Sequence, residues 1–349
     1  MPESNKIEHR IYLDHAATAP MLPAAQAAMQ DGFARWANPS SPHADGRSAR
    51  SALEEARRRL KQALDWQGEV IFTSGASEAI AIALTRSKAP LKAMLPVEHT
   101  AVLRWQDEAA RWPVAESGIA ATPPEDLAGL VAIQHVNNET GVIQPVADIA
   151  ATVRAASGVL FCDCAQSAGK LALPDADMIA ISAHKFGGPV GAGALLLRDY
   201  GLIEAVGGQE QGYRAGTENL PAALAMVAAL EAGNAWISHA ETLRERLEQG
   251  IEAAGGEAVA KESTRSPAIG AYRMPGVSAA SQLIRFDAAG FAISAGSACS
   301  SGSLKPSHVL EAMHYPHPKE VVRVSLGGET TEREIDAFVK AWTDMANSK

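Results

Sequence analysis

The chain has 349 residues, of which 47% are hydrophobic and 20% are charged, and its formal net charge is −9. This length suffices for two packed domains, and the composition is ordinary for a water-soluble globular protein. The acidic balance, and the lack of any apolar run near the roughly 18 residues needed to span a bilayer, lead us to expect neither nucleic acid nor a membrane as a partner.

The first ten residues, MPESNKIEHR, are polar and lack the apolar core of a secretion signal. The 3 cysteines are too few, and odd in number, for a disulfide framework, which favours a reducing compartment. We therefore expect a cytoplasmic protein.

Short apolar runs alternate with helix-like segments between residues 68 and 200. The expected strands are EVIFTS (69–74), KAMLPV (92–97), LVAIQHV (130–136), GVLFCD (158–163), DMIAIS (177–182) and ALLLR (194–198). They are almost continuously apolar, as strands buried on both faces of a mostly parallel sheet are. Helices are predicted between them, for example over 77–85 and 146–156. This alternation predicts an α/β domain with a mostly parallel central sheet.

The pattern changes after residue 235. The segment 236–254 is typical of one amphipathic helix, since Leu243, Leu247 and Ile251 recur four residues apart on one face. The last helix is predicted to begin at the capping box formed by Thr331 and Glu334. We predict a large domain over 12–235 and a smaller α+β domain made of 1–11 and 236–349.

Polar residues follow five of the predicted strands. In a parallel α/β sheet, ligands bind beyond the carboxyl ends of the strands. The residues that come there are 75–78, Glu98 and His99, 137–141, Asp163 and Gln166, and finally Ser182, His184 and Lys185. Their shared position predicts one ligand site at this edge of the sheet.

These residue types suit pyridoxal 5′-phosphate (PLP). A small-residue turn that opens a helix offers free N–H groups to a phosphate. Asp163 could pair with a protonated pyridine nitrogen, Lys185 could form a Schiff base, and His99 could stack on a flat ring and exchange protons. Each residue taken alone also has a more common explanation: Asp163 as a helix cap, Lys185 as a surface lysine and His99 as a structural histidine. Their order along one edge favours the cofactor site.

The cysteines fall into two groups. Cys162 and Cys164 lie at a strand end with poor spacing for zinc, so we predict that they pack in the core and that the chain holds no metal. Cys299 lies among small residues in SAGSACSSGS (294–303), where nothing bulky buries it. A thiol there can swing toward a substrate, and an exposed cysteine without a role would be a liability.

With these residues in place, the chain resembles the cysteine desulfurases, which are fold-type I PLP enzymes of the class V aminotransferase group. The motifs that carry the resemblance are YLDHAATAP (12–20), NPSSPHADGRSAR (38–50), FTSGASEA (72–79), EHTAV (98–102), HVNNETGVIQPV (135–146), DCAQSAGK (163–170), SAHKFGGPVGAG (182–193), GGQEQGYRAGTEN (207–219), SAGSACSSGSLKPSHVL (294–310) and VRVSLG (322–327). They cover nearly the whole chain in order. The long Ser/Gly-rich segment around Cys299 is similar to the branch with an extended catalytic loop.

The resemblance implies a role for each matching residue. Lys185 would hold PLP, His99 would stack on its ring, and Cys299 would accept the sulfur. The other cofactor-binding residues would be Asp163 at the ring nitrogen, Gln166 at the ring oxygen, and Ala76, Ser77, Ser182 and His184 at the phosphate. Thr217 would reach the phosphate of a partner subunit, which implies a homodimer. Asn138 and Arg323 would bind the substrate carboxylate, with Arg323 forming a two-pronged contact.

The implied reaction removes sulfur from L-cysteine, leaves L-alanine, and stores the sulfur as a persulfide on Cys299 for an acceptor protein, either a scaffold or a sulfur carrier, as in iron–sulfur cluster assembly. Two alternatives stay open. The first is another fold-type I PLP enzyme, either a selenocysteine lyase or an aminotransferase, although an aminotransferase has no need of Cys299. The second is a non-catalytic scaffold of the same fold, which would be expected to have lost Lys185 or Cys299.

Overall fold

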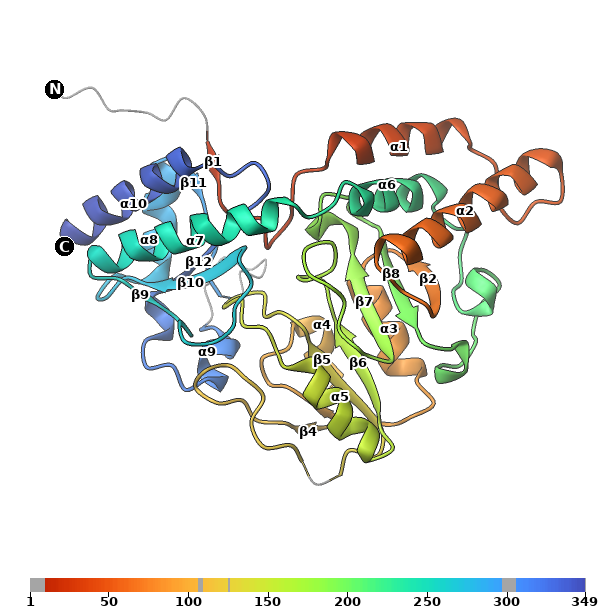
Figure 1. Ribbon diagram of the computed structural model, residues 1–349, viewed down its shortest axis with the longest axis horizontal. Helices are drawn as coiled ribbons and strands as arrows, with labels where there is room; N and C mark the ends of the chain where they lie inside the picture. The colour runs from red at the N-terminus through yellow and green to blue at the C-terminus, as the bar shows by residue number, and fades with distance from the viewer. Residues whose placement is uncertain (1–9, 106–108, 125, 297–305, 349) are drawn as a thin grey trace.

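Figure 1 shows the computed structural model, which describes residues 10–105, 109–124, 126–296 and 306–348. Its centre is a 7-stranded sheet within the described residues. The strands lie in the order β2 (Glu69–Thr73), β8 (Gly193–Leu197), β7 (Met178–Ser182), β6 (Val159–Asp163), β5 (Leu130–Gln134), β3 (Leu91–Met94) and β4 (Ala110–Arg111). β8 runs antiparallel to both of its neighbours, and the other pairs are parallel. The predicted α/β class is confirmed.

Alternate residues of each central strand enter two different hydrophobic clusters, because successive side chains point to opposite faces of a sheet. In β6, Leu160 and Cys162 join one cluster, whereas Phe161 joins the other. The first cluster lies under α2 (Ala44–Ala63), α5 (Val146–Ala155) and α6 (Leu220–Glu231), and the second lies under α3 (Ala76–Arg86). Both faces are therefore covered by helices, which explains the continuously apolar strands.

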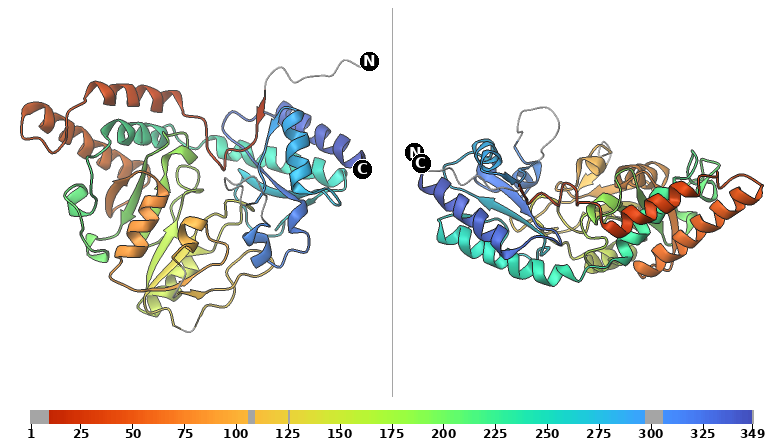
Figure 2. Two further views of the ribbon diagram at one scale, coloured as in Figure 1. Left: turned by 180° about the vertical axis from the view of Figure 1, so that it is seen from behind. Right: turned by 90° about the horizontal axis from the view of Figure 1, so that it is seen from above.

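Two long helices, α1 (Pro23–Ala34) and α2, lie at one end of the molecule beside the large sheet. Both pack against α6 (Figure 1). Figure 2 shows these helices at the end opposite to the C-terminal elements.

The C-terminal elements share a separate aromatic core. β12 (Val321–Ser325), β10 (Ile269–Arg273) and β9 (Glu257–Ala258) form an antiparallel sheet, and β1 (Ile11–Tyr12) pairs in parallel with β11 (Phe291–Ala292). The helices α7 (Trp236–Ala253), α8 (Ala279–Ala288) and α10 (Glu332–Asn347) pack with them. Phe286, Phe338 and Trp342 stack at this core. The division into domains at residues 12 and 235 stays a prediction.

The shorter elements connect these parts. They are α4 (Thr100–Leu103), α9 (His308–Ala312), and the 3₁₀ turns η1 (Ala183–Lys185), η2 (Tyr200–Leu202), η3 (Glu210–Gly212) and η4 (Pro318–Glu320). In the part of the chain that the structure describes, no single helix has the length and apolar character to cross a bilayer; α6 and α7 meet those criteria only together, as a pair bent by 69°.

Candidate active site

A cavity of about 690 Å³ lies where the carboxyl ends of β5, β6 and β7 meet the start of α3. Ten of the twelve predicted site residues line it: Ala76, Ser77, His99, Asn138, Asp163, Gln166, Ser182, His184, Lys185 and Arg323. They come from six separate segments of the chain, and the sheet brings them together as its parallel strand ends require. The sequence prediction of one shared site therefore agrees with the cavity, while the individual roles stay predictions.

The start of α3 forms one wall of the cavity. Gly75 precedes the helix with φ of 148°, a conformation that L side chains rarely adopt, so the turn requires glycine here. Ala76 and Ser77 follow in the first turn, where backbone N–H groups have no partner within the helix. Ser182 and His184 approach from the end of β7. Free N–H groups at a helix start, beside a hydroxyl and an imidazole, suit an anion such as a phosphate, so the predicted phosphate-binding role of these residues stays a prediction.

Lys185 reaches the cavity from η1, directly after β7. Its Nζ donates to the carbonyl oxygens of Ala16 at 2.6 Å and Ala17 at 2.8 Å. Burial, and then the nearby Arg323 cation, lower the pKa of Lys185 from 10.5 to about 8, against the opposing effect of Asp163 and Asp14. A lysine in this state supplies a neutral amine near physiological pH, which a nucleophilic amine requires.

Asp163 and His99 lie on neighbouring strand ends. The Asp163 carboxylate is buried and accepts a hydrogen bond from the Ala165 N–H at 2.9 Å. Burial raises the pKa of Asp163, whereas the nearby His99 and Lys185 act to lower it. The His99 Nδ1 accepts from the Ala101 N–H at 3.1 Å and so caps α4. His99 therefore does have the structural role considered from the sequence, and this contact leaves Nε2 to carry the proton.

PLP would fit the polar groups that face this cavity. Gln166 is buried, its amide nitrogen donates to the Ala16 carbonyl at 2.8 Å, and its Oε1 has no partner among the described residues. Leaving such an oxygen unpaired in the interior is costly, so a ligand group there is expected. Together with the amine of Lys185, the carboxylate of Asp163 and the helix start at Ala76, it matches the chemistry of a phosphorylated pyridine aldehyde.

The Arg323 side chain has two partners within the described residues. Its Nη1 donates to the Asn138 carbonyl at 2.8 Å, and its Nη2 pairs with the Asp14 carboxylate at 2.7 Å. Its Nε is buried with no partner in the described part of the chain. A substrate carboxylate would therefore meet an arginine that already has one carboxylate partner, Asp14, contributed from the opposite end of the sequence.

Sequence reasoning assigned no role to four further titratable residues that line the cavity: Asp14, Glu78, Glu139 and His308. Glu98, next to His99 in the chain, does not line it. Glu98 is fully buried, and burial followed by the nearby Asp163 charge raises its pKa well above the ordinary value. His308 lies within 2.9 Å of the Glu98 carbonyl oxygen through its Nε2. The motifs that contain these residues were recognised, but their pairings join distant segments and leave no local signal.

The two remaining predicted site residues do not line the cavity. Thr217 is exposed on the loop before α6, and Cys299 lies outside the described residues. Cys162 and Cys164 are fully buried with their sulfur atoms 3.7 Å apart, which confirms the predicted core packing. Among the described residues, no three His, Cys, Asp or Glu side chains gather in a way that could hold a metal ion.

Comparison with known proteins places the chain in a family. The family model "Aminotransferase class-V" matches residues 11–338. A relative from Bradyrhizobium diazoefficiens named "Cysteine desulfurase" is 36% identical, with 96% of this chain and 94% of the relative aligned. The chain belongs to the cysteine desulfurase family within the class-V aminotransferases. A second member of that family, from Gluconacetobacter diazotrophicus, is 34% identical over 93% of this chain and 90% of its own length.

Solved structures of family members have the same architecture. The NifS-like protein from Rickettsia africae superposes with a TM-score of 0.87 at 26% identity, covering 97% of this chain and all of that one. A structure titled "SspA in complex with cysteine" superposes with a TM-score of 0.77 at 27% identity and covers 92% of this chain. The resemblance identified from the motifs is thus confirmed at the level of family and fold.

Proposed function

We propose that this chain is a PLP-dependent cysteine desulfurase that converts L-cysteine to L-alanine and takes the sulfur onto Cys299. The observation that carries the proposal is the lowered pKa of Lys185 in a cavity shared with Asp163 and His99. An aminotransferase would need the lysine and the aspartate but not the cysteine. The family membership and the SAGSACSSGS segment favour the desulfurase.

Each cavity residue then has a chemical task. The N-terminus of α3 with Ser77, Ser182 and His184 would bind the phosphate. Asp163 would hold a proton on the ring nitrogen, Gln166 would contact the ring oxygen, and His99 would lie against the ring. PLP bound in this way supplies an electron sink for the substrate α-carbon.

The proton and sulfur transfers are assigned to two side chains. Lys185, as a neutral amine, would take the α-proton of cysteine, while Asn138 and Arg323 orient the substrate carboxylate. The Cys299 thiolate would attack the substrate sulfur: a new S–S bond forms, the C–S bond breaks, and its electron pair remains with the three-carbon fragment. That fragment gains protons and leaves as alanine, so atoms and electrons balance.

The proposed function also involves a second copy of the chain and a sulfur-accepting protein. Thr217 is exposed, as it must be if it completes the phosphate site of a second copy, so we include a homodimer. We also include a cytoplasmic location, transfer of the persulfide to a scaffold or sulfur-carrier protein, and membership of the extended-loop branch. Sedimentation of the PLP-loaded protein tests the dimer, since a fully active monomer would contradict it.

The deciding experiment is to incubate the PLP-loaded protein with L-cysteine and to quantify alanine while locating the added sulfur atom by peptide mass spectrometry. The expected result is one alanine per sulfur and a mass increase of one sulfur on the Cys299 peptide. Cys299→Ser should bind PLP but release almost no alanine. Sulfur on the Cys162 and Cys164 peptide, or turnover without Cys299, would refute the mechanism, and keto-acid production would favour an aminotransferase.

A further inference from the structure

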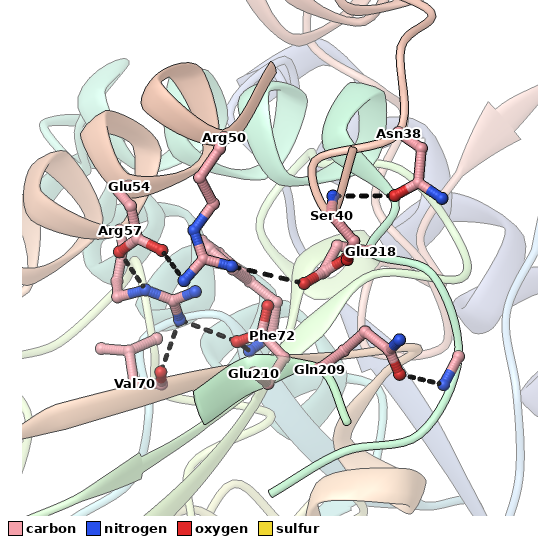
Figure 3. Close-up of polar contacts among 11 residues, drawn as sticks. Asn38, Ser40, Arg50, Glu54, Arg57, Val70, Phe72, Gln209, Glu210 and Glu218 are labelled. Carbon is pink, nitrogen blue, oxygen red and sulfur yellow. Dashed lines mark hydrogen bonds and ion pairs between the residues drawn. The ribbon is translucent and has the colours of Figure 1, made fainter. Parts of the chain in front are cut away.

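The loop between β8 and α6, residues 207–219, is fixed to the edge of the central sheet by buried charges (Figure 3). The Glu210 carboxylate accepts from Arg57 Nη1 at 2.8 Å and from the Phe72 N–H at 2.9 Å. Arg57 also donates to the Val70 carbonyl at 2.5 Å. Glu210 is only 1% exposed. Because one arginine and one carboxylate bridge α2, β2 and this loop, the start of the loop has one fixed position.

The same loop is closed on itself. The Gln209 N–H donates to the Arg214 carbonyl at 3.0 Å, and the Arg214 N–H donates back to the Gln209 carbonyl at 3.2 Å. The Gln209 Oε1 accepts from the Gly216 N–H at 2.9 Å. Glu210 and Gln211, at the tip of this turn, have φ of 48° and 59°, which costs energy for residues other than glycine. The anchored Glu210 and the closed turn together fix the position of the Arg214 backbone.

Arg214 makes a two-pronged ion pair with Glu78. Its Nε lies 2.9 Å from Oε1 and its Nη2 lies 3.3 Å from Oε2. Glu78 Oε2 also accepts from the Ser74 N–H at 2.5 Å. Burial acts to raise the pKa of Glu78, but the hydrogen bonds from Arg214 and Ser74 outweigh it and leave the pKa below its ordinary value. The carboxylate is therefore ionised and paired.

Glu78 lies where its charge would affect the binding of an anion at the start of α3. Glu78 lies in the first turn of α3 and lines the cavity beside Ala76 and Ser77, whereas Arg214 lies behind it and does not line the cavity. An unpaired carboxylate at the start of this helix would repel a phosphate from the very N–H groups that should bind it.

We propose that Arg214 is a positioning residue for the cofactor phosphate: it neutralises and holds Glu78, so that the start of α3 stays favourable to an anion. This inference rests on the proposed function, because the phosphate is that of PLP. The loop predicted to serve a partner subunit through Thr217 would then also serve the phosphate site of its own subunit through Arg214.

The test is equilibrium binding to the full-length apo-protein, followed by absorbance, with PLP and with pyridoxal, which lacks the phosphate. Arg214→Met should weaken PLP binding about tenfold or more, the range expected for loss of one charge-assisted interaction, and change pyridoxal binding less than about twofold. Glu78→Gln should bind PLP as tightly as the wild type or more tightly. The double variant should recover to within about threefold of Glu78→Gln.

Arg59→Met is the matched control, because Arg59 pairs with Glu231 at 2.8 Å between α2 and α6, away from the cavity. It should bind both ligands as the wild type does. Equal losses for PLP and pyridoxal, or no recovery in the double variant, would overturn the inference. If Arg214→Met does not fold, the sign of the Glu78→Gln effect still decides, since weaker PLP binding contradicts the inference. A wild-type protein that binds no PLP would instead refute the proposed function.

Discussion

The lowered pKa of Lys185 gives a prediction that needs no substrate. With a pKa of about 8, roughly one Lys185 side chain in ten is neutral at pH 7, whereas a lysine at the ordinary 10.5 is neutral about once in three thousand. At pH 7 the neutral, reactive form of Lys185 is therefore about 300 times more populated than that of an ordinary lysine, and Lys185 should be acylated faster than its accessibility alone would give, by a smaller factor because an amine of lower pKa is a weaker nucleophile.

The assay is competitive acetylation of the apo-protein with limiting acetic anhydride from pH 6 to 11, read by peptide mass spectrometry. Lys261 is the internal control, since its hydrogen bond to Glu252 raises its pKa above 10.5. The rate at Lys185 should reach half its maximum near pH 8. Arg323→Met should move that midpoint upward by removing a nearby cation, and Asp163→Asn should move it downward by removing an anion. Superimposable pH profiles for Lys185 and Lys261 would refute the reasoning.

Three further variants test other parts of the structure. Asp163→Asn should still fold and bind PLP but lose about a hundredfold or more in alanine release, with little change in Tm; an unchanged rate would mean that the carboxylate is only structural. Cys162→Ser should cost about 1–3 kcal/mol in urea denaturation because it buries a hydroxyl, yet leave persulfide formation on Cys299 intact. Arg57→Met should lower the free energy of unfolding by about 3–5 kcal/mol, because it leaves Glu210 buried without its cation. Adding Glu210→Gln to the same chain should recover part of that loss. A loss below about 1 kcal/mol would contradict the stabilising role of the Arg57–Glu210 ion pair.

The sequence predicted the central strands well because their signal is local. Five of the six predicted strands coincide with the observed ones to within about two residues, as for 158–163 and β6 (Val159–Asp163). The exception is 92–97, where β3 ends at Met94 because the chain turns at Pro96, whose nitrogen cannot donate to a sheet. The reversed direction of β8 has a visible cause in retrospect: residues 183–192 are too short for the crossover that a parallel strand needs.

The sequence predicted which residues of the site lie at the ends of strands, but not which residues pair across the site. Lys185, Asp163 and Gln166 follow apolar strands and so were placed at one edge. The partnership of Arg323 with Asp14 joins residues 309 apart in the chain, and no periodicity reports it. The bond between Glu210 and the Phe72 N–H depends likewise on tertiary packing, as does the burial of Glu98 beside Asp163.

The Arg57–Glu210 ion pair at β2 also limits how two copies of the chain can associate. β2 is the last strand of its sheet, and the outward N–H of Phe72 and the carbonyl of Val70 are the groups that an added strand would use. Glu210 and Arg57 already occupy both, so an extended segment of another molecule finds no open template there. Folding of the 207–219 loop thus closes the edge. A chain caught before that step would expose the unpaired edge of this five-residue strand, with its apolar centre Val70–Phe72, to aggregation.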